Sequence, residues 1–361
     1  MYNLIFIHLG STPPQYLWEG IERAKRQFPK IRILLVANCD NVVQLAEKKE
    51  IEVYRYRSSE ITEQIFLKIN QSLDFKFREG FWRYSLERLF ALCDVHEYVG
   101  NSPLLHFESD ILTFNNFPWT GFLDLKRMSW LKFNDESDVA SIITSPDISS
   151  TRRFKEHLER VLTNEPYLTD MTVLSRIRHY YPSEYELLPS ISPSMALELQ
   201  LRDLEPLSNF KSFGGYFDPA GLGMWNLGQD PRNGFGFARR FISLPEASID
   251  PSCVRLTLQD NGNLVDQNMD SVFNLHVHSK NIRIIKGNSQ EYLTRYLSGG
   301  RYQKREKIFS FKLFIDLLTD YFKRGKLLEL VGNIPQVKRM DRFTFFLKAK
   351  SQIKRLKNKS N

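Results

Sequence analysis

The stretch that decides the fold is NLIFIHL, over residues 3–9, an almost unbroken apolar run that ends at a glycine. A segment with apolar residues at helical spacing follows it, and a second apolar run, IRILLVAN, occupies residues 31–38. A short helix then leads to a third predicted strand at residues 52–56. Continuously apolar strands that alternate with helices are typical of a parallel α/β sheet that is covered on both faces.

Residues at the carboxyl ends of these strands are candidates for ligand binding, because ligands of such sheets bind beyond that edge. His8 and Gly10 stand at the end of the first strand, and Asp40 follows the second. We therefore expect these three residues to lie near one another at the edge where a ligand binds.

The composition is that of an ordinary globular protein, with 361 residues, of which 42% are hydrophobic and 25% are charged. No stretch reaches the roughly 20 consecutive apolar residues of a membrane-spanning helix, and the chain opens directly on a strand-like run. The three cysteines are far apart and form neither a disulfide framework nor a zinc motif. We expect a cytoplasmic protein.

The net charge of +8 belongs to the C-terminal end of the chain. Residues 338–361 contain nine of the 50 lysines and arginines and one of the 42 acids, which leaves 41 of each sign elsewhere. A basic segment of this kind binds anionic lipid, nucleic acid or nothing in particular. With an amphipathic helix predicted at residues 308–322, it could lie on an anionic membrane surface; the alternative is a helix packed on the body of the protein.

The segment PLLHFESDILTF, over residues 103–114, is a predicted strand with two acids near its end. On a strand, Glu108 and Asp110 point to the same side, with their side chains about 6–7 Å apart. Such a pair favours a hard cation such as Mg²⁺ or Mn²⁺, which takes oxygen ligands from carboxylates and from substrate phosphates. The alternative is a solvated turn after the strand.

A late predicted strand, FNLHVHSKNIRII, occupies residues 273–285. Period-two alternation places His276 and His278 on one face with Asn274, and Lys280 follows directly. Imidazole is a good ligand for Mn²⁺, and an ammonium group suits a phosphate. The alternative is one core histidine and one surface histidine.

Residues 214–236 hold seven of the 18 glycines. The segment predicts a short helix over 219–227, which Asp218 would cap and the following glycine would end. Trp225 offers an apolar face that suits a sugar ring. Asp218 and Asp230 are the carboxylates available here for chemistry, and the alternatives are a cap for the first and a turn residue for the second.

Between these motifs the sequence is less informative. A helix predicted at residues 81–92 carries Arg88 on the same stripe as Tyr84. Residues 125–210 suggest mainly helices and loops, with a capped helix from Thr169 to Tyr180.

Taken together, these features resemble the GT-A glycosyltransferases, which use nucleotide-sugar donors. The shared order is a parallel α/β half, a helix with an arginine, a strand that ends in a DxD-type element, an acceptor loop with an acid, and a strand with a histidine before a basic residue. The glycine-rich stretch is similar to the acceptor loop of bacterial transferases that build surface polysaccharide. The resemblance implies a mixed, mostly parallel sheet flanked by helices, with a C-terminal helical extension.

The resemblance also implies a division of the chain and a set of roles. Residues 1–123 would bind the nucleotide sugar, residues 124–290 would bind the acceptor, and residues 291–361 would form a helical, basic extension. Asp110 would be the metal ligand together with His278, or alternatively with His276. The remaining donor-binding positions that the resemblance implies are His8, Gly10, Asp40, Arg88, Glu108 (near the ribose or a metal-bound water) and Lys280 (on the diphosphate).

The implied reaction is transfer of a hexosyl unit, by default from a uridine diphosphate sugar, to a glycan or lipid-linked saccharide of the bacterial surface, with Mn²⁺ or Mg²⁺. An inverting reaction needs a carboxylate base, for which Asp218 is the first candidate and Asp230 the second. In a retaining reaction Asp218 would bind the acceptor instead, and in either case Trp225 would contact it. The protein would work in the cytoplasm or at the inner face of the cell membrane.

Three other functions are weaker matches to the sequence. A sugar nucleotidyltransferase would share the fold, but GSTPPQ near the N-terminus offers one glycine and no basic residue for a phosphate loop. A non-catalytic protein that binds nucleic acid or a membrane through residues 338–361 is disfavoured by the neutral body. A catalytically inactive scaffold, suggested by the departure of ESD from DxD, would bind no metal.

Overall fold

The computed structural model of the chain describes residues 2–228, 249–280, 293–294 and 297, all of which belong to one compact unit. Asp230, the helix expected at 308–322 and the basic segment 338–361 lie outside the described residues, as does nearly all of the extension expected after residue 290.

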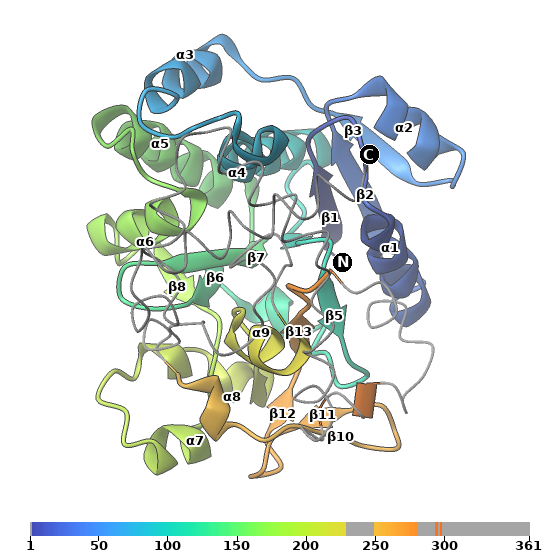
Figure 1. Cartoon of the computed structure of the whole chain (residues 1–361), viewed down its shortest axis with the longest axis vertical. Coiled ribbons are helices and arrows are strands. Elements are labelled where there is room, and N and C mark those ends of the chain that lie inside the picture. The colour runs from blue at the N-terminus through green and yellow to red at the C-terminus, as the bar shows by residue number, and fades with distance from the viewer. Residues whose placement is uncertain (1, 229–248, 281–292, 295–296, 298–361) are drawn as a thin grey trace, which may run out of the picture. The chain divides into compact units, whose positions relative to one another are not determined.

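The described elements alternate between strands and helices from β1 to α3 (Figure 1). In chain order they are β1 (Asn3–His8), α1 (Gln15–Gln27), β2 (Arg32–Ala37), α2 (Asp40–Glu47), β3 (Glu52–Arg55), α3 (Glu60–Ile69), α4 (Phe81–Val99), β4 (Leu104–Phe107), β5 (Ile111–Thr113), β6 (Met128–Lys132), β7 (Asp138–Ser145), α5 (Ile148–Asn164) and α6 (Asp170–Tyr180). They continue with β8 (Tyr185–Leu187), α7 (Pro193–Glu198), α8 (Phe210–Phe213), β9 (Gly215–Tyr216), α9 (Gly221–Leu227), β10 (Thr257–Leu258), β11 (Leu264–Val265), β12 (Ser271–Val272) and β13 (Asn274–His276).

The central sheet has seven strands in the order β3-β2-β1-β4-β7-β6-β8. β1 pairs parallel with β2 and β4, β2 with β3, and β6 with β8, whereas β7 runs antiparallel to β4 and β6. The sheet is therefore mixed and mostly parallel, and this confirms the expected fold class. The functional division at residue 123 stays a prediction, and β4 and β7, which lie on either side of it, are neighbours in this one sheet.

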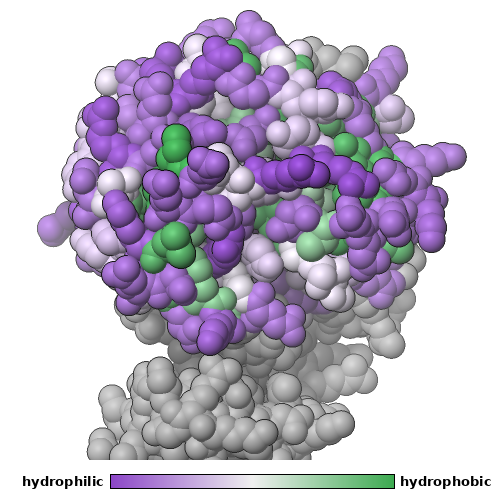
Figure 2. All heavy atoms as spheres, turned by 90° about the horizontal axis from the view of Figure 1, so that it is seen from above, coloured by the Kyte–Doolittle hydropathy of each residue, from purple (hydrophilic) through white to green (hydrophobic). Residues whose placement is uncertain are grey.

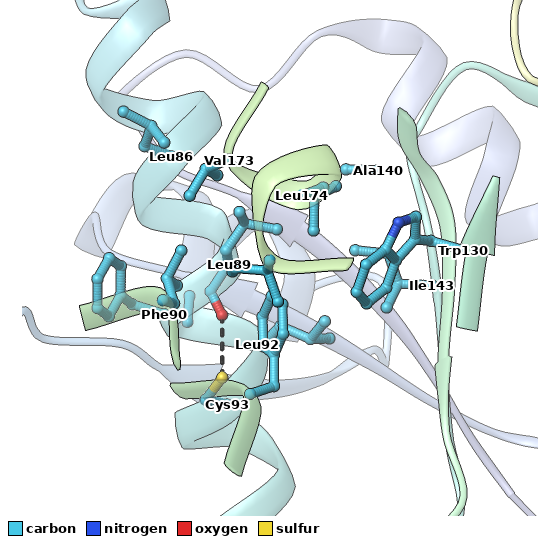
Figure 3. Close-up of a cluster of buried hydrophobic side chains, with 14 of the residues drawn as sticks. Leu86, Leu89, Phe90, Leu92, Cys93, Trp130, Ala140, Ile143, Val173 and Leu174 are labelled. Atoms are coloured by element: carbon cyan, nitrogen blue, oxygen red, sulfur yellow. Dashed lines mark hydrogen bonds between the residues drawn. The ribbon is translucent and has the colours of Figure 1, made fainter. Parts of the chain in front are cut away.

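Alternating side chains of the strands enter two hydrophobic cores on opposite faces of the sheet. Ile5 and Leu34 belong to the core that helices α3, α4, α5 and α6 cover, and Leu4 and Leu35 belong to the core under α1 and α2. Figure 3 shows part of the first core, formed by Leu86, Leu89, Phe90, Leu92 and Cys93 of α4, Trp130 of β6, Ala140 and Ile143 of β7, and Val173 and Leu174 of α6. Both faces of the sheet are thus covered by helices, as nearly continuous apolar strands require.

Residues 125–210 consist mainly of helices and loops, as expected, but they also contain three strands of the central sheet, β6, β7 and β8, which the sequence did not predict. All eight residues of β7, DVASIITS, are buried. Serines and threonines interrupt its apolar pattern. The Thr144 hydroxyl donates to the Leu104 carbonyl at 3.1 Å, and the Ser145 hydroxyl donates to the Asp147 carbonyl at 3.0 Å. The Ser141 hydroxyl is buried and has no hydrogen-bond partner among the described residues. The capped helix in this region is confirmed as α6, where the Thr169 side chain accepts from the Thr172 amide.

The face of the molecule seen in Figure 2 is mainly hydrophilic, with hydrophobic side chains in small, scattered groups. Exposed hydrophobic side chains of the described residues include Ile61 and Leu67 on α3. Scattered apolar side chains are normal on a folded surface and do not by themselves mark a binding site. None of the helices in the described part of the chain combines the length and the hydrophobicity needed to span a bilayer.

Candidate functional site

Glu108 and Asp110 lie in the turn between β4 and β5, and not on a strand as expected. The Ile111 amide donates to the Glu108 carbonyl at 3.2 Å and closes the turn. Helix α1 packs closely on the turn, since a Cβ at Gly20 would lie 2.9 Å from the Ser109 carbonyl oxygen. The missing side chain at Gly20 thus allows the helix to approach the turn and hold the two acids in place.

Strand β13 brings His276 to this turn from more than 160 residues along the chain. It pairs antiparallel with β5, with His276 opposite Ile111. The His276 Nε2 atom lies 3.0 Å from Asp110 Oδ2 and 3.2 Å from Glu108 Oε2. One ligand atom from each of these three side chains lies within 4.8 Å of the other two. We call Glu108, Asp110 and His276 the acid–histidine cluster.

Two cations border the acid–histidine cluster. The Lys280 ammonium pairs with Asp110, and the Arg88 guanidinium of α4 pairs with Glu108. Lys280 has a left-handed backbone with a φ of 53°, and its Nζ lies 5.6 Å from the ring centroid of Tyr16 on α1. Each acid of the cluster therefore has its own basic partner, and both predicted basic residues lie at the site.

Asp170, the first residue of α6, also reaches this site, and sequence analysis missed it. Its carboxylate accepts from the second Nη of Arg88 at 2.6 Å. The sequence marked this position only as the residue after a helix cap, and nothing in it linked Asp170 to an arginine 82 positions earlier.

Positive charge around the cluster keeps both acids ionised. Burial acts to raise the pKa of both acids. For Glu108, the charges of Arg88 and His276 outweigh burial and lower the pKa. For Asp110, His276 and Lys280 hold the pKa well below its ordinary value. Burial acts to lower the pKa of His276, and the neighbouring Asp110 outweighs it, so that this pKa is raised. Carboxylates must be deprotonated to bind a metal, and these two are.

The donor set of the cluster fits a divalent cation such as Mn²⁺. Two carboxylates and an imidazole are ligand types that this ion accepts, whereas Mg²⁺ prefers oxygen ligands alone. The second ring nitrogen of His276, Nδ1, lies 3.5 Å from the Pro219 carbonyl oxygen. A backbone carbonyl in that position is the usual partner that orients a metal-binding imidazole.

His278 lies beside the cluster and not in it. β13 ends at His276, so the two histidines do not share a strand face as expected. The two imidazole rings lie with their centroids 4.2 Å apart, and His278 Nε2 is buried with no hydrogen-bond partner among the described residues. Of the two histidines proposed as metal ligands, the structure places His276 close to the acids.

Burial of a neutral His278 predicts a specific sensitivity to acid. Burial, and then the charge of His276, lower the pKa of His278 from 6.5 to about 3. Between these values the unfolded chain binds a proton that the folded protein excludes, so this residue makes stability fall as the pH falls, by at most about 1.4 kcal/mol per pH unit. We expect the free energy of unfolding, from urea titrations between pH 6.5 and 4.5, to fall less steeply in His278→Gln than in the wild type. Equal slopes would contradict a buried neutral histidine.

Asp218 is fully buried at the start of α9. Its carboxylate accepts from the amides of Leu222 at 3.0 Å, Gly223 at 2.7 Å and His276 at 3.0 Å. Burial raises its pKa, which these hydrogen bonds only partly offset. The geometry matches the capping interpretation, although α9 begins at Gly221, two residues later than predicted. Asp218 also ties α9 to the strand that carries His276.

Gly223 allows α9 to pass directly against β13, because a Cβ at this position would overlap the His276 backbone carbonyl. We expect Gly223→Ala to lower the free energy of unfolding by about 1–3 kcal/mol and to displace His276. The matched control is Gly221→Ala on the same helix, where a Cβ would meet Pro251 at an ordinary 3.9 Å. Thermal unfolding of both variants checks this, and equal stability would show that the contact is not tight.

The other predicted donor residues lie at the carboxyl ends of β1 and β2. The Gly10 amide donates to Asn38 Oδ1 at 2.8 Å, and the exposed Asp40 pairs with Arg55 at 2.6 Å. His8 has a buried Nε2 without a hydrogen-bond partner among the described residues. The ring of Tyr84, one turn before Arg88 on α4, lies against Gly10. These residues share an edge of the sheet, and their roles toward a donor stay predictions.

The glycine-rich segment is described only as far as residue 228. Trp225 is half-buried on α9, and Asp230 lies outside the described residues. Asp218 borders a pocket together with Lys132 and Tyr216. Roles of Trp225 and Asp230 toward an acceptor stay predictions.

No protein-family model and no curated protein sequence matches the chain. Solved structures to which it is similar include the galactosyltransferase LgtC in complex with donor and acceptor sugar analogs, at 13% identity and a TM-score of 0.39 over 57% of this chain and 81% of that one. The PaToxG glycosyltransferase is similar at 11% identity and a TM-score of 0.34, over 59% of this chain and 78% of that one. The chain is also similar to a putative glucose-1-phosphate thymidylyltransferase from Bacillus anthracis, at 9% identity and a TM-score of 0.32, over 52% of this chain and 87% of that one.

Proposed function

We propose that the protein is a metal-assisted glycosyltransferase, which moves a hexosyl unit from a nucleoside diphosphate sugar to a saccharide acceptor. The observation that carries this proposal is the acid–histidine cluster, with its two bordering cations, in the turn after a central strand of a mostly parallel sheet. Ligand sites of α/β sheets lie at this edge. A buried group of two ionised carboxylates and an imidazole is suited to a divalent cation that binds a diphosphate.

Glu108, Asp110 and His276 would hold Mn²⁺ or Mg²⁺. When bound, the cation supplies positive charge that stabilises the nucleoside diphosphate as a leaving group. Lys280 adds a second positive charge at the site, which suits a phosphate, and its side chain is 25% exposed. His8, Gly10 and Asp40 would contact the base and ribose of the donor, for which uridine is our first choice.

The acceptor would bind on the side of α9, with Trp225 against a sugar ring. Because the Asp218 carboxylate already accepts three backbone amides, we propose that it holds α9 and His276 in place. If the reaction inverts configuration, Asp230 is then the better candidate for the base; a retaining reaction needs none. A lipid-linked saccharide at an anionic membrane surface, approached through residues 338–361, is the acceptor that we propose for a role in surface polysaccharide synthesis.

The test is a panel of nucleotide sugars, each incubated with the full chain with and without Mn²⁺, with release of nucleoside diphosphate as the readout. We expect one donor to be hydrolysed slowly in the absence of an acceptor, and only with the metal. A parallel assay with nucleoside triphosphates and sugar 1-phosphates measures pyrophosphate release. Pyrophosphate release without donor hydrolysis would replace the proposal with a nucleotidyltransferase, and inactivity in both assays would contradict it.

A further inference from the structure

The Arg88 guanidinium is shared between two carboxylates that come from distant parts of the chain. One Nη donates to Glu108 and the other donates to Asp170 at 2.6 Å. The three side chains are largely buried, with 15% of Arg88, 17% of Glu108 and 11% of Asp170 exposed. Two bonds from a planar guanidinium to two fixed acids determine its orientation, which a single bond would not.

This sharing matters for Glu108, because the same carboxylate faces His276 through its other oxygen at 3.2 Å. An arginine paired with Glu108 alone would cancel the charge with which Glu108 attracts a metal, and burial would make that effect strong. Asp170 supplies a second negative charge for Arg88. The Arg88–Asp170 pair is then neutral, and Glu108 keeps its charge for the cluster.

We propose that Asp170 is a positioning residue of the metal site, which holds Arg88 and neutralises it so that Glu108 stays available to a divalent cation. This inference rests on the proposed function, since it assumes that the acid–histidine cluster binds a metal. Asp170 would act through Arg88 and needs no contact with the metal or the substrate.

The test is the affinity of the full-chain protein for Mn²⁺, measured by electron paramagnetic resonance without any donor. Residues that orient metal ligands typically contribute about 10–100-fold to metal affinity, so we expect Asp170→Asn to bind Mn²⁺ at least about 10-fold more weakly. The matched control is Asp94→Asn, which breaks a 2.8 Å pair between α4 and Lys155 away from the site and should leave the affinity unchanged.

The double variant Arg88→Met/Asp170→Asn separates positioning through Arg88 from a general structural role. With the arginine removed, Glu108 loses the cation with which it is paired, and we expect Mn²⁺ affinity within about 3-fold of the wild type, or tighter. If Asp170→Asn alone fails to fold, an affinity of the double variant more than about 3-fold weaker than that of the wild type would by itself overturn the proposal. Wild-type affinity in Asp170→Asn, or a double variant as weak as that single variant, would overturn the proposal.

The failure of the metal site itself would look different. In that case Asp110→Asn would bind Mn²⁺ as the wild type does, whatever Asp170 contributes.

Discussion

Asp110→Asn is expected to reduce the metal-dependent release of nucleoside diphosphate by about 100-fold or more. The substitution removes the negative charge from a residue that contacts both His276 and Lys280. A neutral amide oxygen is a much weaker ligand for a divalent cation than a carboxylate. The metal and Lys280 would therefore both lose the group that positions them.

The control for this prediction is Asp124→Asn, the same exchange at an exposed carboxylate. It should retain the wild-type rate and the wild-type response to Mn²⁺. Circular dichroism and thermal unfolding establish that both variants are folded before rates are compared. If Asp110→Asn kept more than a tenth of the wild-type rate, Asp110 would not be a metal ligand.

Asp218→Asn is expected to destabilise the protein by about 2–4 kcal/mol, because hydrogen bonds to a charged group contribute about 1.5–3 kcal/mol each. One carboxylate oxygen accepts from both Gly223 and His276, and the other accepts from Leu222. An asparagine has a single acceptor oxygen, so its NH₂ group would face one of these buried amides. The loss should appear as a lower free energy of unfolding in urea.

The control is Asp250→Asn, an exposed cap whose side chain accepts from the Ser252 amide at 2.9 Å. Because the site is open to water, this exchange should cost less than about 1 kcal/mol. The comparison also decides between the two interpretations of Asp218. Full stability in Asp218→Asn, together with a large loss of turnover, would indicate a catalytic base and contradict the capping role.

Several elements of the fold could be predicted from the sequence because the patterns that define them are local. β1 and β2 are continuous apolar runs, and α6 begins with a side-chain cap that the sequence shows directly. β7 was missed because buried serines and threonines interrupt its apolar pattern, and the bond from the Thr144 hydroxyl to the Leu104 carbonyl forms only in the assembled sheet. A strand of this kind has no distinctive local pattern.

The sequence predicted residues of the site only where they stand together in a short motif. Glu108, Asp110, His276 and Lys280 were found as two motifs, and β5 and β13 bring these motifs together. The choice of His276 over His278 depends on where β13 ends, and period-two alternation cannot determine that. Asp170 has no signal at all, since its contact with Arg88 depends on how α4 and α6 pack on the same face of the sheet.

Anomalous diffraction at the manganese absorption edge, from crystals of the full chain grown with Mn²⁺, would show directly whether the acid–histidine cluster binds a metal. We expect one strong anomalous peak about 2.0–2.3 Å from a carboxylate oxygen of Asp110 and from His276 Nε2, with Glu108 on the same ion or on a water bound to it. The peak should be missing in crystals of Asp110→Asn. A peak elsewhere in the wild type, with Lys280 and His276 still bonded to Asp110, would contradict the metal site and the function proposed from it.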